Sequence, residues 1–575
     1  MESVLIMLVV FGGYLAMYQI YGKYIGNKIF KLSDSNPVPA VEFEDGVDFV
    51  PTKKEVIFGH HFASIAGTGP IVGPAIAVIW GWLPALIWVF VGSIVMGAAH
   101  DFGTLILSMR NQGKSLSEIT GKFINTRTKF FLFFIIFLEL WIIVSIFGLV
   151  IAILFKMYPQ SVLPVWLEIP IAVYLGHIVY KKGANLAIWS IVAVLIMYLT
   201  VVWGAYMPLK MPSVLGLSPI AVWSIILLIY AYIASVLPVT TLLQPRDYIN
   251  SHELVIALAL LVLGVLVSGL SGDLHIVAPA VRPHPEGTPP LWPFLFITIA
   301  CGAISGFHAL VSSGTSSKQV RQETDSLFVG YGSMLMEGSL ATLVIIATTA
   351  GIGMGYLSKD GHILTGVEAW THHYASWAAA GGLSSKVGAF VEGSANMIQS
   401  LGIPKGIAMT IMGVFVASFA GTTLDTATRV QRYLVSETFP KTFKNKHVAT
   451  GFVILMALIL IFSSGADGKG ALALWPLFGA TNQTLAALAL LVVSIYLKGR
   501  SKWGWLVSFL PAVFMLVVSM WAVILNQTRF MDKHNLLLEV LNGIIFIAMI
   551  WVAVDGGRKL FSTKYDEKKL AEEVK

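Results

Sequence analysis

Apolar runs of about 20 residues recur along the whole chain, and they constrain its fold more than any other feature. A helical run of this length matches the hydrocarbon core of a bilayer. Since backbone polar groups must be satisfied within lipid, such runs predict membrane-spanning helices and not a barrel. Hydrophobic residues make up 56% of the 575 residues and charged residues 12%, about half the charged share of a soluble domain. The composition therefore excludes a soluble enzyme, a disordered protein and a nucleic-acid-binding domain.

We predict fifteen membrane spans. The apolar piece at 387–399 is not counted, because it is too short to cross and carries Glu392 and Asn396; we expect it to be re-entrant or to lie at the surface. The predicted spans are 4–21, 57–80, 82–107, 130–155, 163–180, 187–206, 217–237, 253–272, 291–313, 328–357, 404–424, 448–464, 472–496, 504–525 and 537–554.

Basic residues set the expected orientation. With the N-terminus outside, 29 of the 38 Lys and Arg residues fall in the cytoplasmic connections and the tail. Short cytoplasmic loops carry such an excess, so we predict an outside N-terminus and a cytoplasmic C-terminus. Most of these basic residues are expected to set topology and nothing more.

Two of the predicted spans are rich in residues that interrupt helices. The segment 59–74 contains four Gly and two Pro residues, and 301–318 is rich in Gly, Ser and Thr. Pro removes a backbone donor and clashes with the preceding turn, and Gly lowers helix propensity. Freed backbone groups at membrane depth must be met by protein, water, ions or substrate. Both spans are therefore predicted to be broken.

The two broken spans share a spacing. His61, Gly67 and Thr68 match His308, Gly314 and Thr315, and seven spans separate the start of one element from the start of the other. An odd number makes the elements enter the membrane from opposite faces, which indicates an inverted repeat of the kind found in secondary transporters. Close helix packing through small residues is the alternative explanation of the glycines. The predicted organisation is a first span and cytoplasmic loop at 1–56, a first repeat at 57–272, a second repeat at 273–554 with its broken helix at 291–318, and a cytoplasmic tail at 555–575.

Several long motifs resemble the carbon starvation protein A (CstA) family, over nearly the whole chain. They are Asp45–Thr52, Phe58–Pro74, His100-Asp101 with Arg110, Gly302–Gln319, Thr422–Tyr433 and Trp475–Gln483. The resemblance implies a cytoplasmic-membrane transporter used in nutrient scavenging, whose relatives are associated with peptide uptake and with pyruvate uptake coupled to protons. It also implies a LeuT-like fold of the amino acid–polyamine–organocation type with extra helices.

Substrate is expected between the two broken helices near the membrane midplane. There the positive ends of half-helices and backbone amides can hold a carboxylate. The predicted substrate-binding residues are His61, Ser64, Gly67, Thr68 and Gly69 from the first broken helix, and His308, Ser312, Ser313, Gly314 and Thr315 from the second.

Ionisable and hydroxyl side chains within the spans are candidates for coupling a cation, because charges at membrane depth are costly and by default functional. Ordinary roles stay open for each: Asp101 could pair with Arg110, Asp425 with Arg429 or Arg432, and a buried His or Glu could be a packing partner. The predicted coupling residues are His60, His61, Asp101, Glu139, Glu337, Ser418, Thr422, Thr423 and Asp425.

The coupling ion stays open between H⁺ and Na⁺. Ser418, Thr422 and Thr423 could reach the carbonyls near Ala66 and Gly67 and form a hard-oxygen site for Na⁺. The resemblance favours H⁺ instead, because a family member is associated with proton coupling; His61, Asp101 and Glu337 could then serve, and we prefer H⁺. The histidines would also suit a soft metal, but no Cys or carboxylate accompanies them at metal-binding spacing, so we predict no metal and no cofactor.

The sequence as a whole predicts a secondary active transporter and not an enzyme. It would import a small carboxylate-bearing nutrient, such as pyruvate, an amino acid or a peptide, across the lipid bilayer with a cation. A metal-ion permease or channel on the same scaffold is the alternative. A membrane-embedded enzyme would need a nucleophile with a base, and a sensor would need an output domain; the motifs provide neither. The oligomeric state stays open.

Overall fold

A computed structural model describes residues 1–358, 361–380 and 382–562, and it is almost entirely helical. The α-helices are α1 (Glu2–Met17), α2 (Pro39–Glu42), α3 (Lys54–Ala66), α4 (Gly69–Ala77), α5 (Trp82–Gly92), α6 (Ala98–Met109), α7 (Leu116–Phe123), α8 (Thr126–Met157), α9 (Val162–Gly176), α10 (Leu186–Tyr206), α11 (Pro219–Val236), α12 (Leu243–Ser271), α13 (Leu291–Thr298), α14 (Gly306–Gly314), α15 (Ser333–Thr349), α16 (Gly366–Tyr374), α17 (Trp377–Ala380), α18 (Leu383–Gln399), α19 (Lys405–Thr438), α20 (Lys446–Ile461), α21 (Trp475–Lys498), α22 (Leu506–Asp532) and α23 (Leu536–Phe561). Strands β1 (Tyr356–Leu357) and β2 (Ile363–Leu364) pair antiparallel.

Within the described residues, thirteen helices are long and apolar enough to cross a membrane, and fourteen if the bent pair α3–α4 is one span. The sequence predicted fifteen. The difference is the predicted span 291–313, which consists of the two short helices α13 and α14. An all-α, multi-pass fold is thus confirmed, with one crossing more fragmented than the hydropathy suggests.

Two predicted helix ends are wrong, and both errors concern charged residues. Helix α12 begins at Leu243 and not near 253, and α19 continues to Thr438 and not to 424. Pro245 lies in the first turn of α12, where a missing amide is tolerated. Residues that were assigned to cytoplasmic connections, Arg246 and Arg429 among them, therefore lie on long buried helices.

The predicted non-spanning piece at 387–399 forms most of α18. This helix is not among the candidate spans, and it buries Phe390 and Met397 in the interior. Asn396 donates to the carbonyl oxygens of Gly351 and Gly355, at 3.0 and 2.7 Å. It is therefore an integral part of the packed core and not a helix that rests on the surface.

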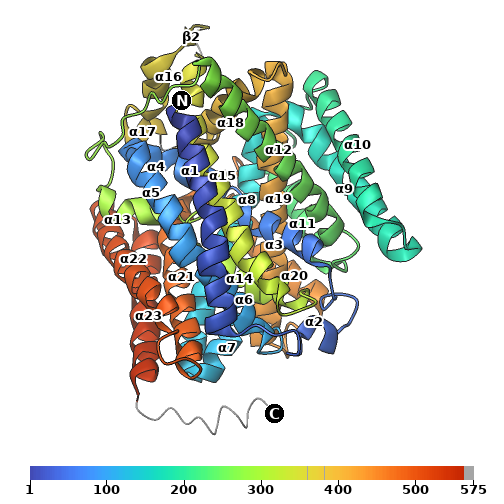
Figure 1. Ribbon diagram of the computed structural model, residues 1–575, viewed down its shortest axis with the longest axis vertical. Coiled ribbons are helices and arrows are strands. Elements are labelled where there is room, and N and C mark those ends of the chain that lie inside the picture. Colours follow the sequence, from blue (N-terminus) through green and yellow to red (C-terminus); the bar gives the residue numbers. More distant parts are fainter. Residues whose placement is uncertain (359–360, 381, 563–575) are drawn as a thin grey trace.

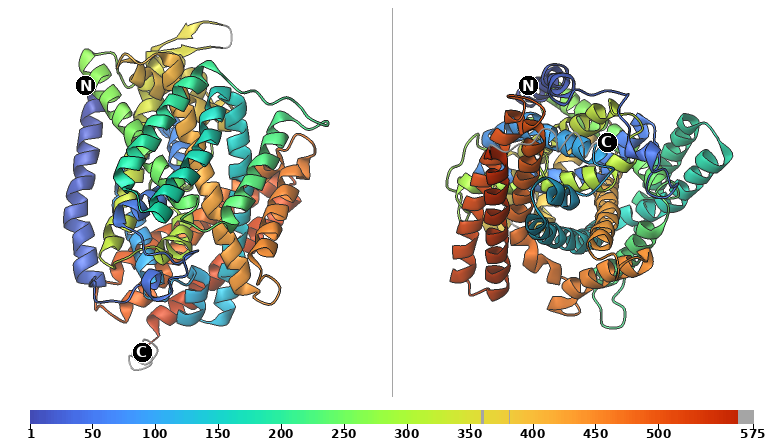
Figure 2. Two further views of the ribbon diagram at one scale, coloured as in Figure 1. Left: turned by 90° about the vertical axis from the view of Figure 1, so that its right-hand side faces the viewer. Right: turned by 90° about the horizontal axis from the view of Figure 1, so that it is seen from below.

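The most buried helices surround the centre of the molecule. Every residue in the most apolar stretch of the span that contains α21 is buried, and the spans of α15 and α19 are nearly as enclosed. Helix α1 runs along the outside of the bundle (Figure 1). Seen from below, α22 and α23 lie on one side and the hairpin α9–α10 on the other (Figure 2). The interior helices therefore hold the polar groups, and the peripheral ones face the lipid.

The start of α1 and the end of α23 lie at opposite ends of the molecule (Figure 1). Helices α16 and α17 lie at the end that holds Met1. Of the predicted tail 555–575, residues up to Phe561 continue α23, and residues 563–575 lie outside the described part.

Candidate functional site

The first predicted broken helix is interrupted between α3 and α4, which meet at an angle of 43°. Gly67 ends α3 with φ 7° and ψ −144°, outside the helical region, and Pro70 lies in the first turn of α4, a position that suits proline. A Cβ on Gly67 would lie 2.5 Å from Thr423 Oγ1. The missing side chain thus lets α19 approach the break.

The second broken helix is interrupted upstream of the predicted place. Helix α13 ends at Thr298 and α14 begins at Gly306, and between them Gly302 has a φ of +84°, which favours glycine. The predicted segment Ser312–Thr315 instead forms the last turn of α14 and its C-cap. A Gly-Thr pair that ends a helix looks in sequence like one that breaks it.

The two interrupted segments lie against each other. A Cβ on Gly69 would be 2.6 Å from Cys301 Cβ, and a Cβ on Gly73 would be 2.8 Å from the Thr298 carbonyl oxygen. Both distances are too short for a side chain, so only glycine allows the backbones of α4 and of the segment 298–302 to approach this closely.

The paired histidines of α3 contact the far end of α14. His61 Nδ1 lies 2.8 Å from Ser316 Oγ, and His60 Nε2 lies 3.4 Å from Thr315 Oγ1. His60 Nδ1 also lies 2.5 Å from Asp247 Oδ2 on α12. The two broken helices therefore touch at two levels, at the breaks and at the end of α14.

A cavity of about 320 Å³ lies beside the two breaks. It reaches from buried Thr68 to exposed Lys533. Helix α17, which contributes Trp377 to its wall, lies toward the end of the molecule that holds Met1 (Figure 1). Thr68 and Gly69 are the predicted substrate-binding residues that line it. The others, His61, Ser64, Gly67, His308, Ser312, Ser313, Gly314 and Thr315, are buried elsewhere and do not line it.

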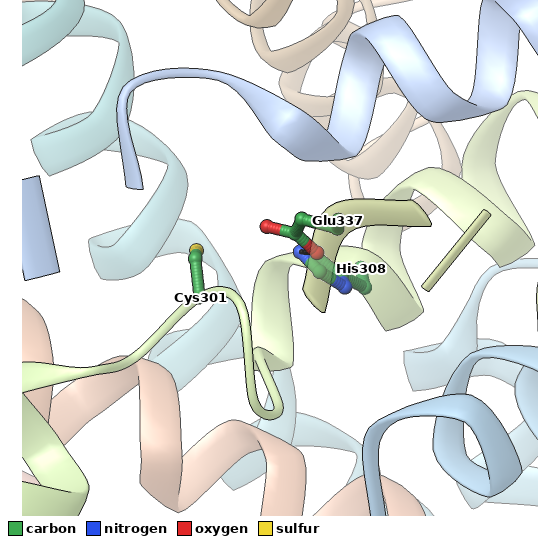
Figure 3. Close-up of side chains that lie close together, drawn as sticks. All are labelled: Cys301, His308 and Glu337. Carbon is green, nitrogen blue, oxygen red and sulfur yellow. Dashed lines mark ion pairs between the residues drawn. The ribbon is translucent and has the colours of Figure 1, made fainter. Parts of the chain in front are cut away.

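Three predicted ionisable residues meet in one buried cluster, which we call the relay cluster: Asp101, His308 and Glu337. His308 Nδ1 lies 2.8 Å from Asp101 Oδ2, and His308 Nε2 lies 3.4 Å from Glu337 Oε2. Figure 3 shows His308 and Glu337 side by side. Asp101 does not pair with Arg110, whose guanidinium contacts Glu323. The relay cluster joins α6, α14 and α15.

Each end of the relay cluster has a further partner. Asp101 Oδ1 lies 2.8 Å from His100 Nδ1, and the Gly302 amide donates to Glu337 Oε1 at 3.2 Å. All four side chains are fully buried. With both carboxylates ionised and both histidines neutral, this group would carry two uncompensated negative charges at membrane depth, which is very costly. A change of protonation in this group would therefore alter a buried charge that contacts the backbone of the second break.

Cys301 lies near the relay cluster, on the unwound segment (Figure 3). Its Sγ and one ligand atom each of His308 and Glu337 lie within 4.8 Å of one another. Thiolate, imidazole and carboxylate are all transition-metal ligands. No metal was predicted from the sequence, because Cys301 and Glu337 lie 7 and 29 residues from His308 and do not form a recognised metal-binding spacing; the fold brings the three together.

The serine hydroxyls of α14 donate hydrogen bonds to backbone carbonyl oxygens. Ser312 Oγ donates to the Asp101 carbonyl oxygen at 3.3 Å, and Ser313 Oγ donates to that of Ala309 at 2.7 Å. Gly314 packs against Val430. These residues hold α14 against α6 and α19, and they are not at the cavity.

Asp425 belongs to a second buried charge network. Its carboxylate contacts Arg246 and accepts from Tyr230 OH at 2.7 Å, and Arg246 also lies 3.2 Å from Glu168. The local pair of Asp425 with Arg429 is therefore wrong, because Arg429 pairs with Asp48 at 2.8 Å. Ser418 donates to Glu168 at 3.1 Å and is thereby part of this network.

The hydroxyls proposed for Na⁺ are only partly directed at the first break. Thr423 Oγ1 donates to the Ser64 carbonyl oxygen at 3.1 Å, and Ser64 Oγ lies 2.9 Å from Thr426 Oγ1. Thr422 accepts from Asn250 at 2.9 Å instead. Thr426 was not predicted, although its place one turn after Thr422 on the same helix was a signal for it.

Glu139 is the isolated member of the predicted coupling residues. It is fully buried on α8, and neither carboxyl oxygen has a hydrogen-bond partner among the described residues. The relay cluster and the first break therefore do not include it.

Besides Thr426, sequence reasoning missed Glu168, Arg246, Asp247 and Cys301 in these networks, and Lys386 in the cavity wall. A signal existed for Glu168, which is a charge within the predicted span 163–180. Arg246 and Asp247 were hidden by the wrong start of α12.

An almost wholly helical membrane protein, with two interrupted helices packed at a central cavity, has the architecture of a secondary transporter. A mutant of the Eremococcus coleocola manganese transporter has the same LeuT-like fold, with a TM-score of 0.51 at 12% identity over 90% of this chain and 99% of that one. That likeness concerns the fold alone.

The chain belongs to the carbon starvation protein CstA family, which it matches over residues 2–522. It is 31% identical to the "Peptide transporter CstA" of Campylobacter jejuni, over 97% of this chain and 85% of that one. It is 32% identical to the "Pyruvate/proton symporter BtsT" of Escherichia coli K12, over 89% and 80% of the two chains. The resemblance seen in the motifs is thus confirmed, and the chain is a multi-pass membrane transporter.

Proposed function

We propose that this transporter is a symporter that imports a small carboxylate-bearing nutrient together with H⁺. The observation that carries the proposal is the relay cluster, Asp101, His308 and Glu337. It is a fully buried chain of two carboxylates and an imidazole that ends on the Gly302 amide. Gain or loss of a proton there changes the charge next to the second break, one residue from Cys301 in the cavity wall.

The cavity supports a carboxylate as cargo. Thr68 and Gly69, at its base, form the N-terminal end of α4. A helix N-terminus carries a partial positive charge and favours anions. The names of the relatives, for peptides and for pyruvate with protons, agree with a carboxylate-bearing substrate.

The orientation is part of the proposal. The excess of Lys and Arg supports an outside N-terminus and a cytoplasmic C-terminus in the cytoplasmic membrane. The cavity then reaches toward the outside, and uptake follows as the cavity closes there and opens to the cytoplasm.

Two alternatives rest on specific contacts. Ser64, Thr423 and Thr426 place oxygens together at the first break, which would suit Na⁺ in place of H⁺. Cys301, His308 and Glu337 supply three possible metal ligands, which would suit a metal-ion permease.

The test is uptake into proteoliposomes of labelled pyruvate and dialanine, under a proton gradient or a sodium gradient imposed separately. We expect the proton gradient to drive accumulation in Na⁺-free choline buffer. Glu337→Gln should abolish accumulation but keep exchange of labelled for unlabelled substrate, because the amide cannot carry the proton. Glu118→Gln is the matched control, because among the described residues that carboxylate pairs with Lys129, away from the relay cluster.

If accumulation requires Na⁺ and is lost in Thr423→Ala, the coupling ion is Na⁺ and not H⁺. If Mn²⁺ or Zn²⁺ is taken up saturably and neither organic substrate is, the protein is a metal permease and the proposed symporter function is wrong.

A further inference from the structure

The cavity beside the two breaks is lined by cations and by no described acidic residue. Lys386 comes from the start of α18, Arg529 from the last turn of α22, and Lys533 from the turn that follows. Trp377 and Trp475 contribute much of the apolar wall. A pocket with this lining attracts anions, because nothing in its described wall neutralises the cations.

Lys386 is the most informative of the three. Its exposed fraction is 6%, its ammonium lies 5.5 Å from the centre of the Trp475 ring, and no described residue gives it an ion pair or a side-chain hydrogen bond. Burial lowers the pKa of Lys386 to about 8. An ammonium held in this way is costly unless a counter-ion reaches it, and the cavity is the place from which one can come.

Asn526 and Arg529 face the same cavity from α22. They are three residues apart, hence on one face of the helix. Asn526 is 3% exposed, and its side-chain nitrogen has no hydrogen-bond partner among the described residues. The Arg529 guanidinium lies 5.6 Å from the centre of the Phe294 ring. Two further donors thus line the cavity with Lys386, and neither has an acceptor among the described residues.

Two backbone acceptors near the second break are already occupied. The carbonyl oxygen of Ala300, which lines the cavity, accepts from Asn482 at 2.9 Å, and that of Ile299 accepts from Gln483 at 3.4 Å. At the first break, the Thr68 carbonyl oxygen accepts from the amides of α4. A substrate ammonium group would therefore find few partners here, whereas a carboxylate would find several donors.

We propose that Lys386, Asn526 and Arg529 form an anion-binding site that selects carboxylates without a compensating ammonium group, such as 2-oxo and 2-hydroxy monocarboxylates, over zwitterionic amino acids and peptides. This inference rests on the proposed function and specifies its substrate class. Lys386 and Arg529 supply charge, Asn526 supplies a neutral donor, and the indole and phenyl rings pack on the short carbon chain.

The experiment measures equilibrium binding to the full-length protein in detergent, by calorimetry and without any gradient. The probes are pyruvate, its neutral methyl ester and zwitterionic dialanine. For the unaltered protein we expect pyruvate to bind at least tenfold more tightly than either of the others, which tests the inference even if a variant does not fold.

Lys386→Gln should weaken pyruvate binding about ten- to a hundredfold, the usual range for losing a hydrogen bond to a charged group. Lys386→Arg should keep it within a few-fold. Lys469→Gln, which removes an exposed lysine outside the cavity wall, is the matched control and should change nothing. Pyruvate affinity should also fall as the pH rises through about 8, because the lysine then loses its proton, and this fall should disappear in Lys386→Arg.

Proton-driven uptake of the same probes separates the two proposals. If a proton gradient accumulates dialanine as well as pyruvate, and Lys386→Gln binds pyruvate normally, the anion site is refuted and the symporter stands. If neither compound is taken up under any gradient, the proposed function itself fails.

Discussion

One carboxylate, that of Asp48, connects the chain before α3 to α19, and we predict that its removal moves the protein between conformations. Asp48, in the connection before α3, lies 2.8 Å from Arg429 and 3.5 Å from Arg432, and it accepts from Tyr433 OH. Two residues after Asp48, the amide of Val50 donates to the Lys318 carbonyl oxygen at 3.1 Å. We call this set of contacts the Asp48 latch. It ties the first broken helix to α19 and to the segment after α14.

The expected free-energy cost of removing the Asp48 carboxylate follows from how deeply its ion pair with Arg429 is buried. Removing one partner of a buried ion pair costs about 3–5 kcal/mol. The Asp48 side chain is 20% exposed while that of Arg429 is 0% exposed, and Arg429 keeps the carbonyl oxygens of Ala234 and Leu237 as acceptors. We therefore expect a smaller loss for Asp48→Asn, about 2 kcal/mol, which favours the opened state by roughly 30-fold.

Cys301 is the reporter, since it is the single cysteine of the chain and lines the cavity. A membrane-impermeant thiol reagent is added to oriented vesicles from either side. In Asp48→Asn, labelling from the Met1 side should slow and labelling from the other side should rise, with the ratio of the two rates changing by up to roughly 30-fold. Glu44→Gln removes an exposed acid from the same connection and should leave the ratio unchanged. Equal ratios in Asp48→Asn and the unaltered protein would refute the latch.

Three further outcomes are expected. Burial acts to raise the pKa of the Asp48 carboxyl, but Arg429 and Arg432 outweigh it and hold the pKa below its usual value; Asp48 is then ionised at both pH 5.5 and pH 7.5, and the effect of Asp48→Asn on the labelling ratio should be the same at both. Gly69→Ala should reduce uptake at least tenfold because its Cβ meets Cys301, and adding Cys301→Gly should restore part of it if that contact is the cause. Glu139→Gln should keep proton-driven accumulation, since neither carboxyl oxygen of Glu139 has a hydrogen-bond partner among the described residues; loss of accumulation in this variant would add α8 to the proton path.

Helix-forming segments were predictable from the sequence because lipid imposes a length and an apolar composition on each crossing. The first break was predictable too, since Gly67, Gly69 and Pro70 act locally on the backbone. The second was misplaced because Gly302 breaks the chain without a proline, whereas the Gly-Thr pair at 314–315 only ends a helix.

Members of the relay cluster could be predicted one by one but not as a cluster. Asp101, His308 and Glu337 each stand out as ionisable residues in an apolar run, yet Asp101 and His308 are 207 residues apart, and no local pattern pairs them. Arg246 was missed for a different reason. The predicted span began at 253 and left Arg246 in a connection, whereas α12 begins at Leu243, with Pro245 in a first turn that tolerates proline.

One short segment, α14 with the turn that follows it, connects the relay cluster to the Asp48 latch. Helix α14 carries His308 in its first turn, where the imidazole lies between Asp101 and Glu337. The 3₁₀ turn Ser316–Lys318 follows directly, and the Lys318 ammonium lies 3.9 Å from the centre of the Tyr433 ring. Packed interfaces have discrete arrangements and do not deform continuously. A change of charge at His308 that shifts α14 must therefore also shift the contacts of Lys318. Because the Asp48 latch includes the same residues, the proton binding that we propose at one end of α14 would also bias the Asp48 latch at the other end, which is what coupling requires.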